Sequence, residues 1–167
     1  MLKIFAGIVG AVTLLVAAAF VGARFHDGPI AFIPGGPLSS GELVSSPISN
    51  WGFAESVETL ELQLAQDDTS RTTWLVVSDG RAFIPCRLGL VPGKKWHLRA
   101  NQDGRAIIRV LGKRYPVTLR RVSDPTLEAQ LRAVESSKYG SGPPGRAGLW
   151  FFSVEPRALD RGGEARR

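Results

Sequence analysis

Apolar and polar residues alternate through the middle of the chain in the pattern of short strands. Leu60, Leu62 and Leu64 alternate with polar residues, so this segment predicts a strand with one buried and one wet face. Residues 72–78 are rich in β-branched and aromatic side chains and lead directly into Asp79-Gly80, a strong two-residue hairpin signal.

The return arm of that hairpin is predicted over residues 81–87, where Pro85 removes one ladder donor and therefore indicates an edge or a bulge. A further strand is expected over residues 94–99, which alternate in polarity, and a second hairpin over 105–111 and 114–122, around Gly112-Lys113. An aromatic strand is predicted at 149–154. Strands this short and this closely spaced predict a small antiparallel barrel or sandwich.

One helix of the domain is predicted between residues 124 and 140. Asp124 is a good N-cap, Pro125 suits the first helical position and Gly140 suits the C-terminal cap. Apolar residues at helical spacing predict that one stripe of this helix faces the core. The expected fold class is therefore mainly β with one packed α-helix, in a domain spanning residues 52–156 and followed by a charged tail, 157–167.

The N-terminus has a different pattern, because residues 4–23 carry no charge. A helix of twenty residues is about 30 Å long, the thickness of a bilayer core, so we expect residues 1–24 to be a transmembrane anchor, with a cleaved signal peptide as the alternative. Lys3 and the terminal amine favour an inside N-terminus. The sequence thus predicts a single-pass protein of a bacterial inner membrane, with its domain on the exported, periplasmic side.

Residues 25–51 form a connecting segment rich in glycine and proline, which forbid a regular element. The segment also holds Ile30, Phe32, Ile33 and Leu38, more apolar surface than a flexible linker normally carries. We expect it to pack across the barrel or to lie against the membrane surface.

Charge and cysteine content narrow the possible chemistry. The 167-residue chain has a net charge of +6, which suits anionic lipid, nucleic acid or a phosphorylated cofactor, or simply a solvated basic face. Its one cysteine, Cys86, cannot form an internal disulfide and is expected to be a small core residue. Two histidines and one cysteine, far apart in the sequence, predict no metal site. An exported, anchored domain also makes nucleic acid an unexpected partner.

The order of elements resembles the FMN-binding split-barrel superfamily, the group of pyridoxamine phosphate oxidase-like and deazaflavin-dependent reductase-like proteins. The resemblance covers residues 52–155 and includes the helix ending in Lys138-Tyr139-Gly140 before an aromatic strand. Its most suggestive pieces are 93–98 (Gly-Lys-Lys-Trp-His-Leu), Asn101 with 104–106 (Gly-Arg-Ala), and 112–115 (Gly-Lys-Arg-Tyr). The N-terminal anchor with its Gly/Pro stretch is similar to a membrane-anchored bacterial branch of the group.

The resemblance implies a split β-barrel that binds FMN or a deazaflavin. It places Lys94 and Lys95 as phosphate-binding candidates. Residues 73–77 (Thr-Trp-Leu-Val-Val) depart from the group, because they stand where the oxidases carry an Arg-x-(Val/Leu)-Leu-Lys strand that supplies phosphate contacts. On the predicted strand Lys95, His97 and Arg99 share a face, with Arg87 across a short loop, so these basic groups could line one cofactor groove or could meet solvent.

Two functions remain open on the sequence. The first is a membrane-anchored, homodimeric flavin or deazaflavin protein, an oxidoreductase of unknown substrate, in which the cofactor supplies the chemistry. The absence of a Gly-x-Ser-x-Gly, Walker or Rossmann motif agrees with that reading. The alternative is a non-enzymatic membrane-tethered binding or scaffolding module that uses its basic face.

Overall fold

The computed structural model describes residues 2–89, 93, 95–140 and 148–158. The helices are α1 (Leu2–Ala23), the 3₁₀ turn η1 (Gly52–Ala54), α2 (Trp96–Gln102) and α3 (Pro125–Tyr139). The strands are β1 (Thr59–Leu64), β2 (Arg71–Trp74), β3 (Val76–Ser78), β4 (Arg81–Arg87), β5 (Arg105–Val110), β6 (Lys113–Arg121) and β7 (Leu149–Pro156).

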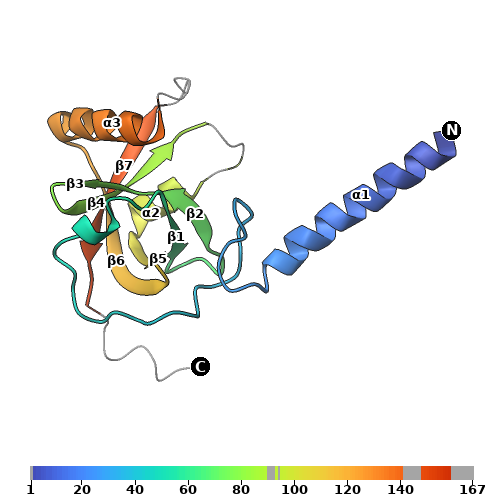
Figure 1. The fold of residues 1–167 in the computed structure, drawn as a ribbon, viewed down its shortest axis with the longest axis horizontal. Coiled ribbons are helices and arrows are strands. Elements are labelled where there is room, and N and C mark those ends of the chain that lie inside the picture. The colour runs from blue at the N-terminus through green and yellow to red at the C-terminus, as the bar shows by residue number, and fades with distance from the viewer. Residues whose placement is uncertain (1, 90–92, 94, 141–147, 159–167) are drawn as a thin grey trace.

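All seven strands belong to one antiparallel sheet in the order β2-β1-β5-β6-β7-β4-β3 (Figure 1). β2 and β3 lie at opposite ends of this order, yet only Leu75 separates them in the chain. We call residues 71–78 the seam strand, because its two halves are the two end strands of the sheet and their continuity in the chain closes the sheet into a barrel. The predicted antiparallel barrel is therefore confirmed.

Two apolar clusters stabilise this arrangement. The larger cluster fills the barrel with side chains that point inward from alternate positions of the strands, as the pattern of Leu60, Leu62 and Leu64 predicts. The smaller lies outside, where Leu131 of α3 packs against Phe83 and Phe151. Cys86 is a buried core residue, as expected. Helix α3 begins as predicted, since the Asp124 carboxylate accepts hydrogen bonds from the N–H groups of Thr126 and Leu127.

The hairpin turns follow their sequence signals. Asp79 and Gly80 both have positive φ, 51° and 70°, which a primed two-residue turn requires. The second hairpin turns at Leu111-Gly112 (φ 49° and 75°), one residue earlier than the predicted Gly112-Lys113, so its arms are β5 and β6 as bounded above.

The strand predicted over residues 94–99 is wrong, because residues 96–102 form helix α2. Trp96 and Ala100, four residues apart, are both buried on one face of this helix. Lys95 and Arg99, four residues apart, lie on the same side of this helix, but His97 is two residues from each and does not, so the three cannot line one groove in the way that a strand would arrange them.

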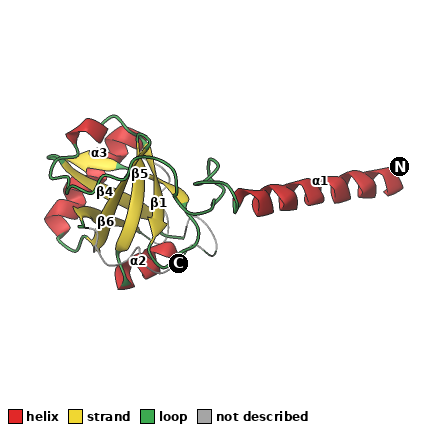
Figure 2. Cartoon of the chain, turned by 90° about the horizontal axis from the view of Figure 1, so that it is seen from below, coloured by secondary structure: helices red, strands yellow, loops and turns green. Residues whose placement is uncertain are grey.

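Helix α1 extends away from the barrel (Figures 1 and 2). Residues 4–23 are helical, as predicted, but no helix in the described part of the chain combines the length and the apolar character that a membrane crossing demands. The predicted transmembrane anchor, and with it the single-pass inner-membrane localisation, is therefore wrong.

The connecting segment packs along the barrel, one of the two placements expected. Gly35 forms a bridge with Ser70, and Leu43 forms a parallel bridge with Arg114 of β6. Arg109 of β5 joins the segment through an ion pair to Asp27 at 2.7 Å, and it also pairs with Glu61 of β1. Burial opposes ionisation of Asp27, but hydrogen bonds from Ser40, Ser39 and Arg109 together hold the pKa of its carboxyl well below the usual range.

Candidate functional site

The barrel opens where β2 parts from β4, and backbone alternation shows how this split is built. Leu75 N–H donates to the Glu58 carbonyl at 3.0 Å, on the β1 side. Since hydrogen bonding alternates along an antiparallel strand, Thr73 also bonds toward β1, whereas the backbone groups of Ser70, Thr72 and Trp74 point away from it. Ser70 confirms this direction, because its N–H and C=O both pair with Gly35 at 3.1 Å.

The facing edge belongs to β4. Leu88 N–H donates to the Gly148 carbonyl at 3.0 Å, so this residue and those an even number of positions before it bond toward β7. Phe83, Pro85 and Arg87 therefore point to the other side. There Phe83 pairs with Val76 of β3, but Pro85 and Arg87 lie beyond the end of β3 and face the split. Pro85 thus occupies an unpaired edge, as its missing N–H predicts.

The C-terminus of α3 holds the seam strand at the point where its two halves diverge. The Lys138 ammonium donates to the carbonyl oxygens of Glu55, Val57 and Leu75 at 2.8, 2.6 and 3.1 Å. The Tyr139 hydroxyl lies 2.5 Å from the Leu75 carbonyl oxygen and accepts from the Leu75 N–H at 3.2 Å. Burial raises the pKa of Tyr139 to about 12 and lowers that of Lys138.

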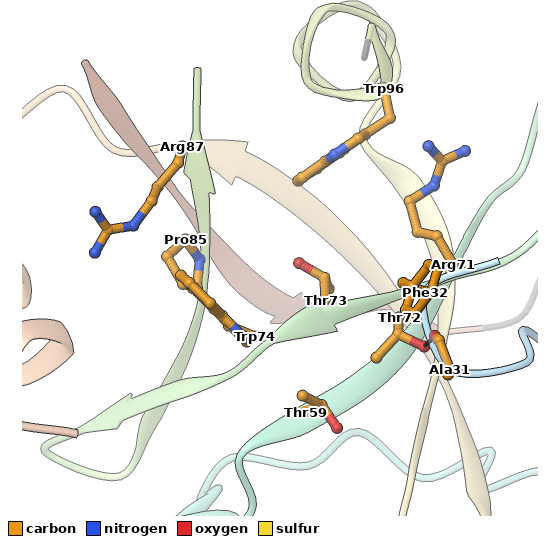
Figure 3. A pocket seen from close by; sticks show the side chains of 10 residues that line it. All are labelled: Ala31, Phe32, Thr59, Arg71, Thr72, Thr73, Trp74, Pro85, Arg87 and Trp96. Carbon is orange, nitrogen blue, oxygen red and sulfur yellow. Dashed lines mark hydrogen bonds between the residues drawn. The ribbon is translucent and has the colours of Figure 1, made fainter. Parts of the chain in front are cut away.

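A cavity of about 510 Å³ occupies the split, within the range of small-molecule sites (Figure 3). It is lined by Ala31, Phe32, Thr59, Arg71, Thr72, Thr73, Trp74, Pro85, Arg87 and Trp96. The lining comes from the facing edges of β2 and β4, the first residue of β1, the first residue of α2 and the tip of the connecting segment. Five segments of the chain thus meet around one space.

Aromatic side chains give the cavity flat apolar walls. Trp96 is 2% exposed and packs on Phe152 inside the barrel, with ring centroids 5.5 Å apart. Trp74 stacks on Tyr139 of α3 at 5.0 Å with an interplanar angle of 12°. These contacts fix both tryptophans before any ligand arrives, which suits recognition of a planar molecule.

Positive charge gathers at one end of the cavity. Arg71 and Arg99 each donate to the same oxygen of Asp67 at 2.9 Å, so two guanidinium groups share one carboxylate. Arg71 Nε is buried and has no hydrogen-bond partner within the described residues. Burial lowers the pKa of Arg71 and Asp67 opposes that shift, so this cation is incompletely compensated. An anionic ligand group would satisfy it.

Arg87 lies across the cavity from Arg71, and its charge is compensated by a carboxylate of the protein. It donates to Glu135 of α3 at 2.7 Å, and the Glu135 side chain is only 4% exposed. The Arg87 guanidinium carbon also lies over the Trp74 ring, 5.6 Å from the ring centroid, on the opposite side of the cavity from Arg71 (Figure 3). The pair therefore fastens β4 to α3 and leaves Arg71 as the better placed cation.

The sequence-predicted site residues do not form one cluster. Arg87 lines the cavity, and Arg99 reaches its Asp67–Arg71 end. Lys95 is exposed just before α2, and His97 packs edge-on against Trp150 at 5.3 Å; neither belongs to the cavity lining. Lys94 lies outside the described residues.

The sequence reasoning missed Arg71, Trp74 and Trp96 as site residues. Arg71 precedes the predicted hairpin and has the appearance of a solvated strand start. The available signal was Pro85, since a proline inside a strand marks an edge that cannot be fully paired. Within the described residues no group of three or more His, Cys, Asp or Glu side chains could hold a metal ion.

Comparison with known proteins finds similarity in structure and none in sequence. No protein-family profile matches the sequence, and no curated protein matches it. Among solved structures the chain is similar to a Listeria innocua protein described as a candidate pyridoxamine 5'-phosphate oxidase. The similarity has a TM-score of 0.43 at 14% identity and covers 61% of this chain and 86% of that one.

Proposed function

We propose that the cavity at the split binds a flavin or a deazaflavin and that the protein is an oxidoreductase. The observation that carries the proposal is Arg71, an incompletely compensated cation in a cavity walled by two tryptophans, whose buried Nε has no hydrogen-bond partner within the described residues. A planar ring with an anionic side chain matches that combination of flat walls and one cationic end.

The residues present fit such a cofactor. Trp74 and Trp96 would flank the ring, and Arg71, supported by Arg99, would hold the phosphate or another anionic group of its side chain. A bound flavin or deazaflavin supplies hydride transfer, and the flavin also one-electron chemistry. The protein's part would be to orient the ring and limit access of water, which explains why the sequence shows no catalytic dyad.

The test is a titration of the purified full-length protein with FMN, followed by quenching of flavin fluorescence. We expect Arg71→Leu to weaken FMN binding about tenfold to a hundredfold, because a hydrogen bond to a charged group contributes about 1.5–3 kcal/mol. Arg71→Lys keeps the charge and should recover part of the affinity.

Arg120→Leu is the matched control, since Arg120 is an exposed strand arginine paired with Glu155 and lies outside the cavity lining. It should bind FMN as the wild type does. A wild-type protein that quenches neither FMN nor a deazaflavin would contradict the proposal. Equal losses in the Arg71 and Arg120 variants would show non-specific charge attraction instead.

Two predictions from the sequence stay predictions. Homodimer formation can be tested by light scattering on the purified protein as it leaves a size-exclusion column. The alternative of a non-enzymatic binding module would gain support if Arg71→Leu abolished association with an anionic partner while flavin had no effect on the protein.

A further inference from the structure

The free edge of β2 carries backbone groups that no other part of the described chain uses. Thr72 and Trp74 point their N–H and C=O groups away from β1, and β2 has no second neighbour in the sheet. The connecting segment takes only the Ser70 position of this edge, through Gly35. Its other contact uses the Thr72 hydroxyl, which donates to the Ala31 carbonyl at 2.5 Å, and so leaves the Thr72 backbone groups unpaired.

The pairing of β1 supports this assignment independently. Glu61 and Gln63 pair with β5, and Ala65 N–H donates to the Arg105 carbonyl at 2.8 Å, so the odd-numbered residues of β1 bond toward β5. The even-numbered residues therefore bond toward β2, where Leu60 is opposite Thr73. Both neighbours of Thr73 must then present their backbone groups to the cavity.

The dimensions of this edge select the kind of group that it can hold. Thr72 and Trp74 are two residues apart, about 7 Å along a strand. Across the split Pro85 has no N–H, so β4 cannot complete a second ladder around an inserted peptide. A single ring edge with adjacent donor and acceptor fits this short, one-sided arrangement better than an extended chain does.

We propose that the Thr72 carbonyl and the Trp74 N–H hold the imide edge of the ligand's ring. The carbonyl would accept from the ring N–H, and the amide would donate to the neighbouring ring carbonyl. The inference rests on the proposed function and deepens it, since flavins and deazaflavins both present such an edge. It also predicts that the site recognises the pyrimidine part of the ring and does not distinguish the two classes there.

The experiment compares lumiflavin with 3-methyllumiflavin, which differ by one methyl group on the imide nitrogen and carry no phosphate. The wild-type protein should bind lumiflavin at least tenfold more tightly, because the methyl group removes the donor and blocks the approach to Thr72. Arg71→Leu should weaken FMN binding but leave the ratio between the two lumiflavins unchanged.

A second readout concerns the protein itself. Amide hydrogen exchange of Trp74, measured by NMR, should slow at least tenfold when lumiflavin saturates the site, whereas the Thr73 amide, already bonded to β1, should change little. Equal affinities for the two lumiflavins, or an unchanged Trp74 amide in the saturated protein, would overturn the inference while FMN binding still stood. Failure to bind any flavin would overturn the proposed function and this inference together.

Discussion

The two halves of the seam strand differ in their pairing with β4, although they are continuous in the chain. β3 pairs with β4 over three residues and closes the barrel, while β2 leaves β4 and opens the cavity. The difference arises at three places: Leu75 is held by α3, Pro85 offers no donor on the facing edge, and two tryptophans occupy the open side. The opening is thus a built feature of the sheet and needs no missing strand.

The first way to break this contrast is to release β4 from α3. Glu135→Leu leaves the half-buried Arg87 without its carboxylate and should lower the free energy of unfolding by about 3 kcal/mol. Urea unfolding followed by tryptophan fluorescence measures the loss. The double variant Arg87→Met with Glu135→Leu removes both charges and should recover most of it. A single variant as stable as the wild type would show that α3 does not fasten the β4 side.

A smaller effect is expected from loosening Leu75 itself. Tyr139→Phe keeps the ring that stacks on Trp74 but removes the two hydroxyl contacts to the Leu75 backbone, which at about 0.5–1.5 kcal/mol each should cost about 1–3 kcal/mol. Tyr115→Phe is a matched control, because Tyr115 is buried and its hydroxyl has no hydrogen bond within the described residues. If both variants lost equal stability, the Leu75 contact would have no special part in the opening.

The smallest expected effect tests the contact between Tyr139 and Leu75 through its dependence on pH. The pKa of Tyr139 is raised to about 12, above the value near 10 of an unfolded tyrosine. Its contribution to stability is therefore fully present below pH 10 and lost as the pH rises to 12, about 1–2 kcal/mol after discounting for partial exposure. Unfolding midpoints of wild type and Tyr139→Phe should converge over that range. Parallel pH profiles would contradict the assignment.

Much of the barrel was predictable because its signals are local. The alternation of Leu60, Leu62 and Leu64, the Asp79-Gly80 turn and the Asp124 cap each depend on neighbouring residues only. Helix α2 was mistaken for a strand because six residues of alternating polarity fit both periods, and only the barrel interior shows that Trp96 and Ala100 share a buried face.

The site was less predictable because it depends on pairings between distant strands. Arg71 and Trp96 reach the same cavity only once β4 has paired with β7 and α2 has packed over the barrel end. Arg87 was found because a basic residue beside a predicted strand suggested phosphate binding, but its carboxylate partner on α3 lies 48 positions away in the sequence. The transmembrane prediction failed on the combined requirement of length and apolar character.

The position of β7 has a consequence for the growing polypeptide on the ribosome. It is the last strand in the described part of the chain, yet it lies between β6 and β4 and pairs with both. Until residues 149–156 have emerged, those two strands each expose an edge with nothing to bond. Co-translational assembly can therefore complete the two hairpins early, whereas the barrel closes only after β7 has emerged and has inserted between β6 and β4.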